Sequence, residues 1–437
     1  MARTEECILY RDFENGEILS TMTSLMNSYE TGEAAFENRK EEFFHMAGSL
    51  VEMAGMYGFS GNLWHTYLTQ LLVNHENAFS TASEIRGSVV GSINHLALHD
   101  FEIFKELYDF DLAVFDKAFG TDCADFLCNY VNTGCNSKVY NQRICDRICD
   151  MSRMLAKAST VEEFMADMVQ FYKDFGVGKL GLNKAFRIEH GRDGRPVIAP
   201  ITRIAHVNLD DLVGYELPKQ KLIENTEAFV KGRKANNCLL FGDAGTGKSS
   251  SIKGILNRYY DDGLRIIEVY KHQFQDLNDV IAQIKNRNYK FILYMDDLSF
   301  EEFEIEYKYL KAVIEGGLEK KPDNILIYAT SNRRHLVREK SGDKLEVADD
   351  EDLHSSDTVQ EKLSLVYRFG VRIYFGAPNK KEFQKIVTTL AERYGVTMPT
   401  EELLLKANAW ELSHGGLTGR TAQQFIDHIL GTSEEKP

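Results

Sequence analysis

The first 195 residues contain no proline, although the chain of 437 residues has seven, beginning at Pro196. Proline lacks a backbone N–H and clashes with the preceding helical turn, so its absence permits long helices. The chain also lacks any apolar run near the roughly 18–20 residues that cross a bilayer. Its acidic start has no signal-peptide core. We therefore expect an intracellular, cytoplasmic protein with no membrane partner.

An excess of basic residues is also missing. The chain has 51 Lys and Arg against 66 Asp and Glu, a formal net charge of −15. Broad binding to nucleic acid or to anionic membranes rewards the opposite balance. A small basic group, Lys231, Arg233 and Lys234, is more typical of a solvated helix end than of a nucleic-acid contact. Nucleic acid is therefore not the favoured partner.

Cysteine is sparse and unevenly placed, with five of the seven between Cys123 and Cys149. Structural zinc sites usually contain a C-x₂-C pair, and none occurs in this sequence. Cys145 and Cys149 are four residues apart and share a helix face if that stretch is helical. We expect buried free thiols in this cluster rather than a zinc ion or an iron–sulfur cluster.

Apolar residues in the first half recur with helical spacing. Ile18 to Tyr29 and Leu63 to Leu72 each follow the pattern of one buried helix face. These stripes predict an all-helical N-terminal domain over residues 1–185. The stretch that follows is rich in Gly, Pro and charge from His190 to Pro196, which indicates a linker or an exposed hairpin. We place the linker at residues 186–205.

From residue 206 short apolar runs alternate with helical stretches. Such alternation predicts an α/β core, a parallel sheet with helices on both faces. We assign this core to residues 206–378 and a C-terminal helical lid to residues 379–437. The five strands expected in the sheet are Asn237–Phe241, Leu264–Tyr270, Phe291–Met295, Asn324–Thr330 and Val371–Phe375.

Gly242 to Ser249, GDAGTGKS, fits the phosphate-binding pattern G-x-x-x-x-G-K-[ST], between an expected strand and an expected helix. Glycines allow successive N–H groups to face one anion, and the helix N-terminus adds positive charge. Lys248 would reach the β- and γ-phosphates of a nucleotide, and Ser249 would ligate Mg²⁺. The predicted ATP-binding residues of this segment are Gly242, Asp243, Ala244, Gly245, Thr246, Gly247, Lys248, Ser249 and Ser250.

Two carboxylates, Asp296 and Asp297, end the expected strand FILYM. In a P-loop ATPase the first acid binds in the Mg²⁺ shell and the second polarises the attacking water. We therefore assign Asp296 and Ser249 to Mg²⁺ and Asp297 to catalysis.

This arrangement resembles the AAA+ ATPases over about residues 206–431, which implies a P-loop AAA+ core with a five-stranded parallel sheet. Asn332, in YATSN, resembles the sensor-1 residue that orients the attacking water. Arg368, in LSLVYRFG, resembles an arginine finger that reaches the nucleotide of a neighbouring subunit. Arg333 and Arg334 are alternatives for that finger.

Two further segments carry the resemblance. Arg420, in GLTGRTA, resembles the sensor-2 arginine that contacts phosphates from the lid. Leu212 and Val213, in LDDLVGY, resemble the contacts to adenine. The blocks GDAGTGKSS, YMDDLSFE, IEGGLEKKPDN, YATSNRRHLV and LTGRTAQQF together resemble the bacterial AAA+ family known as domain of unknown function 815.

The chain departs from the AAA+ pattern in two places. The catalytic acid is commonly Glu, whereas this chain has the shorter Asp297, so hydrolysis is expected to be slow or to depend on Glu301 or Glu302. The segment Lys271–Asp276 lacks the aromatic-apolar-glycine loop of threading unfoldases. That absence argues against a translocase that grips an extended polypeptide.

These observations predict an ATPase that hydrolyses ATP with Mg²⁺ at a site between subunits of a homo-oligomer. The cycle would remodel or switch a protein client held by the N-terminal domain. Two alternatives are a DNA-associated ATPase resembling helicase loaders or transposition helpers, and an ATP-binding scaffold with little turnover. The acidic stretch Val347–Lys362 is interpreted as a mobile loop or a docking surface.

Overall fold

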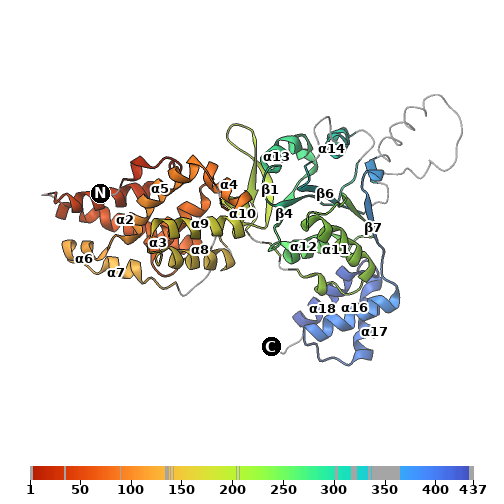
Figure 1. Cartoon of the computed structure of the whole chain (residues 1–437). Helices are drawn as coiled ribbons and strands as arrows, with labels where there is room; N and C mark the ends of the chain where they lie inside the picture. The colour runs from red at the N-terminus through yellow and green to blue at the C-terminus, as the bar shows by residue number, and fades with distance from the viewer. Residues whose placement is uncertain are drawn as a thin grey trace. The chain divides into compact units, whose positions relative to one another are not determined.

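The chain divides into two compact units, Met1–Asn183 and Lys184–Pro437 (Figure 1). The computed structural model describes residues 3–33, 36–88, 90–132, 137, 139–140, 142–202, 204–205, 207–300, 304–315, 322–332, 336 and 365–432. The predicted acidic stretch Val347–Lys362 lies outside these residues.

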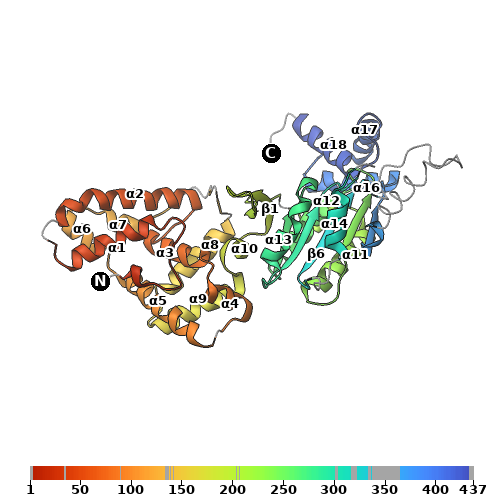
Figure 2. The same cartoon turned by 90° about the horizontal axis from the view of Figure 1, so that it is seen from above.

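The N-terminal unit is helical throughout its described residues, as predicted, and an isolated bridge between Gly61 and Tyr130 is its single β-type pairing there. Figure 2 shows its helices from red at α1 to yellow at α9. They are α1 (Glu17–Glu30), α2 (Lys40–Tyr57), α3 (Leu63–Asn74), α4 (Ala78–Arg86), α5 (Ser92–Asp109), α6 (Ala113–Phe119), α7 (Cys123–Cys128), α8 (Gln142–Leu155), α9 (Val161–Phe175) and α10 (Gly178–Leu182).

Side-chain caps and glycines set the ends of these helices in the absence of proline. Asn62 accepts a hydrogen bond from the backbone N–H of His65 at the start of α3, and Asn77 forms a capping box at the start of α4. Gly58 ends α2 in the left-handed conformation, with φ of 83°. Such caps satisfy N–H and C=O groups that a helix end leaves free, each for about 1 kcal/mol.

The core of the N-terminal unit is aromatic, and several of its buried polar groups form hydrogen bonds. Trp64 is fully buried and donates its indole N–H to a carbonyl of α5 at 2.9 Å. The hydroxyls of Tyr10 and Tyr172 lie 3.0 Å apart. The buried carboxylate of Asp100 accepts backbone N–H groups of Ile8–Tyr10. Each large side chain buried in this way contributes about 1.5–3 kcal/mol.

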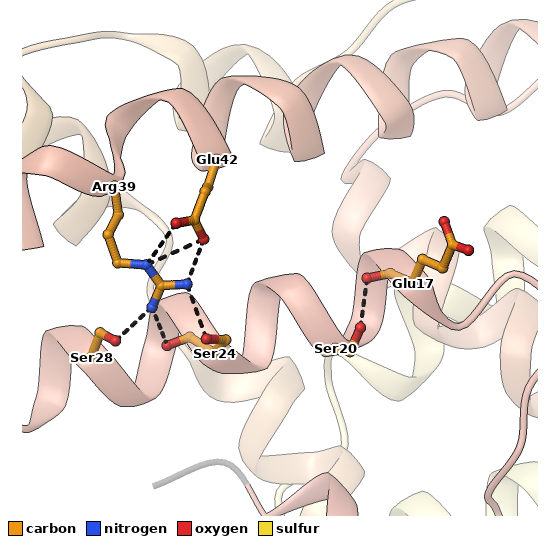
Figure 3. A network of polar contacts seen from close by, with 6 residues as sticks. All are labelled: Glu17, Ser20, Ser24, Ser28, Arg39 and Glu42. Carbon is orange, nitrogen blue, oxygen red and sulfur yellow. Dashed lines mark hydrogen bonds and ion pairs between the residues drawn. The ribbon is translucent and has the colours of Figure 1, made fainter.

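Arg39 joins α1 to α2 (Figure 3). From the residue before α2, its guanidinium donates to the hydroxyl of Ser28 at 2.6 Å and to the hydroxyl and carbonyl of Ser24 on α1. It also pairs with Glu42 in the first turn of α2, and these hydrogen bonds hold the pKa of Glu42 below its usual value. One face of α2 is thereby held against α1.

The C-terminal unit contains a seven-stranded sheet in the order β2-β1-β4-β5-β6-β3-β7. All neighbours are parallel except the antiparallel pair β1 and β2. The strands are β1 (Ala185–His190), β2 (Pro196–Pro200), β3 (Cys238–Gly242), β4 (Leu264–Glu268), β5 (Lys290–Met295), β6 (Ile325–Ser331) and β7 (Val371–Phe375). The five predicted parallel strands are confirmed as β3 to β7.

The sheet differs from the prediction at one edge. The sequence predicts a linker at residues 186–205 and a sheet of five strands. The structure instead forms β1 and β2 from this stretch, and β1 pairs with β4. Pro196 and Pro200 bound β2, which is an edge strand, and an edge tolerates residues that cannot donate a backbone hydrogen bond. The turn between β1 and β2 is the exposed hairpin that the composition also allowed.

Helices flank the sheet, and a small helical lid follows it (Figure 1). The described helices beside the sheet are α11 (Glu216–Val230), α12 (Lys248–Tyr259), α13 (Leu277–Ile284) and α14 (Glu306–Glu315). The lid has its own apolar core and consists of α16 (Lys380–Arg393), α17 (Thr400–Ser413) and α18 (Gly419–Thr432). None of the described helices has both the length and the apolar character that crossing a bilayer requires.

Candidate nucleotide-binding site

A loop of glycine-rich backbone connects the end of β3 to the start of α12. Gly242 and Gly247 have φ of 133° and 90°, values that side-chain-bearing residues rarely adopt. A Cβ on Gly242 would also collide with the carbonyl of Phe375 on β7. The loop therefore depends on these glycines to turn its N–H groups inward above the N-terminus of α12, which is the arrangement that binds phosphate.

Lys248 begins α12 and folds back over this loop. Its side chain is nearly buried, with 6% of the residue exposed. The ammonium donates to the carbonyls of Gly242 at 3.0 Å and Asp243 at 2.6 Å. Burial lowers the pKa of Lys248, and the nearby carboxylates of Asp243, Asp297 and Asp296 oppose that effect. The positive charge of Lys248 is thus held at the loop whose N–H groups are arranged to bind phosphate.

Asp296, directly after β5, is the centre of a hydroxyl–carboxylate network. Its Oδ1 accepts from Ser249 Oγ at 2.8 Å and from Thr330 Oγ1 at 2.5 Å. Burial raises the pKa of Asp296, but the hydrogen bonds from Thr330 and Ser249 outweigh it, so the pKa lies below its usual value. An ionised carboxylate beside a serine hydroxyl is an oxygen pair of the kind that Mg²⁺ takes from proteins.

Asp297 follows in a backbone conformation that favours glycine, with φ of 48°. Its N–H donates to Thr330 Oγ1 at 2.9 Å, and its carboxylate accepts from the Asn332 amide at 2.8 Å. Non-glycine residues in this region cost free energy and cluster at functional sites. The structure brings the two predicted catalytic side chains, Asp297 and Asn332, into direct contact at the ends of neighbouring strands.

A cavity of about 610 Å³ joins these groups to the lid. At its apolar end Leu212 packs with the core of the sheet and Val213 with the core of the lid. Ile386 and Leu390 of α16 complete this end. The remaining predicted residues that line the cavity are Ala244, Gly245, Thr246, Gly247, Lys248, Ser249, Ser250, Asp296, Asp297, Asn332 and Arg420.

Among the cavity residues that the sequence did not predict, Thr330 and Tyr215 bear most on its chemistry. Thr330 links the carboxylate of Asp296 to the backbone N–H of Asp297, and only the pairing of β5 with β6 places it there. Tyr215 lines the cavity with a buried hydroxyl that has no hydrogen-bond partner among the described residues, and burial raises its pKa to about 12. Its position directly after Val213 and Gly214 is the one sequence feature that could have pointed to it. A buried polar atom without a partner fits a cavity that receives a polar ligand.

The loop is tied both to the lid and to the segment that leads into it. The backbone N–H of Arg420, at the start of α18, donates to the carbonyl of Gly245 at 3.2 Å. The carboxylate of Asp243 accepts from the N–H of Ala377 at 2.7 Å, between β7 and α16. These two hydrogen bonds connect the phosphate-binding loop to the lid and to the segment before it.

Arg368, the predicted arginine finger, is not among the residues that line the cavity. Its guanidinium forms an ion pair with Glu315 at the end of α14. The alternatives Arg333, Arg334, Glu301 and Glu302 lie outside the described residues. The predicted residues Gly242 and Asp243 belong to the loop but are not among the residues that line the cavity either, whereas the other predicted site residues do line it.

The clustered cysteines of the sequence belong to the N-terminal unit. Cys145 donates to the carbonyl of Tyr57, and burial raises the pKa of the Cys123, Cys128 and Cys149 thiols. All four are free thiols. In the part of the chain that the structure describes, no three His, Cys, Asp or Glu side chains are grouped to hold a metal ion.

Comparisons with known proteins give one family, and several solved structures match part of the chain. The family model described as "Protein of unknown function (DUF815)" matches residues 182–433. The AAA domain of FIGL-1 in complex with ADP is 16% identical, with a TM-score of 0.36, over 52% of this chain and 74% of that one. PCH-2 of C. elegans is 18% identical, with a TM-score of 0.35, over 52% and 65%.

The RuvB Holliday junction branch migration motor of Thermotoga maritima is 15% identical, with a TM-score of 0.32, over 52% of this chain and 72% of that one. No curated protein matches the sequence. The C-terminal unit has the α/β architecture predicted for it, a mostly parallel sheet with flanking helices, followed by a helical lid. Because the family model covers more than half of its length, the chain belongs to the DUF815 family.

Proposed function

We propose that this protein binds ATP together with Mg²⁺ and hydrolyses the nucleotide. One observation carries the proposal: a continuous hydrogen-bonded network leads from the phosphate-binding loop to the ends of β5 and β6. Its members are Ser249, Asp296, Thr330, Asp297 and Asn332. A loop that only bound phosphate would not need a second carboxylate paired with an amide beside the first.

Each end of the cavity suits one part of the nucleotide. The loop N–H groups, the N-terminus of α12 and Lys248 would hold the triphosphate, and Leu212 and Val213 would contact the adenine. Ser249 and Asp296 would hold Mg²⁺, which neutralises phosphate charge when it is bound.

Asp297 is the proposed general base. The Asn332 amide holds the carboxylate of Asp297 in one orientation, which leaves its second oxygen to accept a proton from water. Aspartate is one methylene shorter than glutamate, so the water has to lie closer to the strand end. We expect turnover to be slow for this reason.

The active site is proposed to be completed by a neighbouring subunit of a homo-oligomer. Arg368 supports this idea because it is a cation away from its own chain's cavity, and an arginine finger supplied in trans acts on the nucleotide of another subunit. Its ion pair with Glu315 would have to exchange for phosphate on assembly. The resulting cycle would move the lid and so remodel or switch a protein client bound by the N-terminal unit.

A second candidate function is a nucleotide-gated scaffold that binds ATP and scarcely hydrolyses it. The short side chain of Asp297, tied to Asn332, favours it. In that case Arg368 and Glu315 would form only a structural ion pair.

The ATPase rate per subunit, measured against protein concentration, separates the two functions. A shared site predicts that specific activity rises with protein concentration. In Arg368→Ala this rise should be lost, so that the rate per subunit at high concentration is at least about tenfold below wild type. Arg372→Ala, on the neighbouring strand β7, is the matched control and should retain the rise. Flat, low activity in every protein, with ATP still bound, would select the scaffold.

A further inference from the structure

An apolar groove of about 560 Å³ lies between α2 and α7 in the N-terminal unit. Phe44 and Val51 of α2 form one wall, and Phe126 and Val131, from α7 and the residues after it, form the other. Phe126 is 70% exposed and Val131 is 75% exposed. Large apolar side chains gathered at this exposure mark an interaction surface more often than isolated ones do.

The floor of the groove is made of small residues. Ala47 and Gly48 lie between Phe44 and Val51 on α2, and a Cβ built on Gly48 meets no atom within 4 Å. Glycine in the middle of a helix costs about 1 kcal/mol relative to alanine, so its presence calls for a reason. A small residue at this place lets another element approach the backbone of α2 closely. Arg39, directly before α2, links the start of this helix to α1 (Figure 3).

Acidic residues surround this apolar strip. Glu41 and Glu52 lie on α2, seven residues before and four residues after Gly48, which puts them on its face of the helix. Asp122 and Asp125, also exposed, lie at the start of α7. The nearby Lys40 donates its ammonium to the carbonyl of Phe119. The surroundings of the groove therefore have a negative charge.

The N-terminal unit as a whole is also negatively charged. Met1–Asn183 contains 27 acidic and 14 basic residues, a net charge of −13 out of −15 for the chain. A partner with basic residues beside an apolar stripe would be attracted at long range and oriented on contact.

We propose that this groove binds an amphipathic helix of a partner protein, with an apolar stripe on one face and Lys or Arg on its flanks. The apolar side chains would enter between Phe44 and Phe126, against the floor at Gly48. The basic flanks would face Glu41, Glu52 and Asp125. This inference concerns a site separate from the nucleotide cavity and stands whether or not ATP is hydrolysed.

Two labelled helical peptides of about 18 residues, or five turns, test the proposal on the full-length protein. Both have the same apolar stripe; one has Lys on its flanks and the other has Glu. Fluorescence anisotropy without nucleotide should give a Kd for the Lys peptide at least about tenfold below that for the Glu peptide, with a difference that shrinks as salt is raised.

Substitutions in the groove locate the binding. Phe126→Ser should weaken binding of the Lys peptide by about tenfold, as removal of a buried aromatic anchor does. Gly48→Leu fills the floor while improving the helix propensity of α2, so its loss of binding cannot be attributed to unfolding. Ile85→Ser, at an exposed apolar residue of α4, is the control and should leave the Kd unchanged.

Several results would overturn the proposal. Equal affinity for the two peptides would remove the charge argument, and full binding by Gly48→Leu would place the contact elsewhere. Self-association of the protein that Phe126→Ser abolishes would make a second copy of this chain the occupant. Because the measurement uses no nucleotide, each failure leaves the proposed ATPase untouched.

Discussion

The two units of this chain differ in charge and in the residues that shape their backbones. Met1–Asn183 has a net charge of −13 and no proline, whereas Lys184–Pro437 has 39 acidic and 37 basic residues, a net charge of −2, and all seven prolines. The first buries aromatic side chains among helices and exposes an apolar groove. The second gathers polar groups at the ends of strands. We propose ATP hydrolysis for the C-terminal unit, where strand ends fix the positions of polar side chains. We propose binding of a partner for the N-terminal unit, through exposed apolar and acidic side chains.

The largest expected effect breaks the chemistry of the C-terminal unit alone. Asp297→Asn keeps the contact with Asn332 but removes the proposed base, so kcat should fall about 1000-fold. ATP affinity should stay within about twofold, because an uncharged isostere still fills the position. Single-turnover hydrolysis and nucleotide titration measure the two quantities. An unchanged kcat would move the base to another residue.

Nucleotide affinity is the next property to separate the units. Lys248→Ala removes the cation of the phosphate-binding loop, and ATP affinity should fall about 100-fold, as expected for two charged hydrogen bonds. Lys253→Ala, at an exposed position of the same helix, is the matched control. Calorimetric titration measures both. Unchanged affinity in Lys248→Ala would contradict the proposed function, and peptide binding by the groove should survive in either variant.

A change in the stability of the N-terminal unit should leave the chemistry of the C-terminal unit unaffected. Asn62→Ala removes the cap of α3, which should lower the free energy of unfolding of that unit by about 1 kcal/mol. Urea unfolding followed by circular dichroism measures the loss. Glu102→Ala, at an exposed position in the middle of α5, is the control for a substitution that removes no helix cap. ATPase activity below the unfolding transition should not change.

The smallest expected effect depends on pH and belongs to the C-terminal unit. The folded-state pKa of Asp296 lies below the unfolded value of about 3.9, so its ionised form stabilises the fold. That contribution is present above about pH 3.9 and is lost as the pH falls through the folded pKa. The difference in unfolding free energy between wild type and Asp296→Asn should therefore shrink from about pH 7 to about pH 3. A constant difference would assign the loss to packing.

Sequence patterns predicted the parts of the fold in which spacing alone determines structure. The loop at Gly242–Ser249 and the strands β3 to β7 have such spacing. The sequence left a linker and a hairpin open for residues 186–205 and did not predict that β1 and β2 join the sheet. Their turn, with Gly191 and Gly194, has a loop composition, and short edge strands between prolines carry little periodicity.

Contacts that depend on pairing between distant strands could not be predicted. Thr330 meets Asp296 only because β5 and β6 are neighbours in register. The pairing of Arg368 with Glu315 likewise depends on where α14 ends. The groove at Phe126 needed the packing of α2 on α7, which no local pattern of the sequence encodes.

The bond between Asp243 and the N–H of Ala377 has a consequence for any force applied to the lid. The segment between β7 and α16 is short, and Pro378 restricts its backbone. Rotation of α16 would therefore strain the hydrogen bond between Asp243 and Ala377 directly. If ATP binds as proposed, one coupling free energy links nucleotide binding at the loop to the position of the lid. By reciprocity, a client that pulls the lid outward weakens nucleotide affinity by the factor by which nucleotide resists the pull.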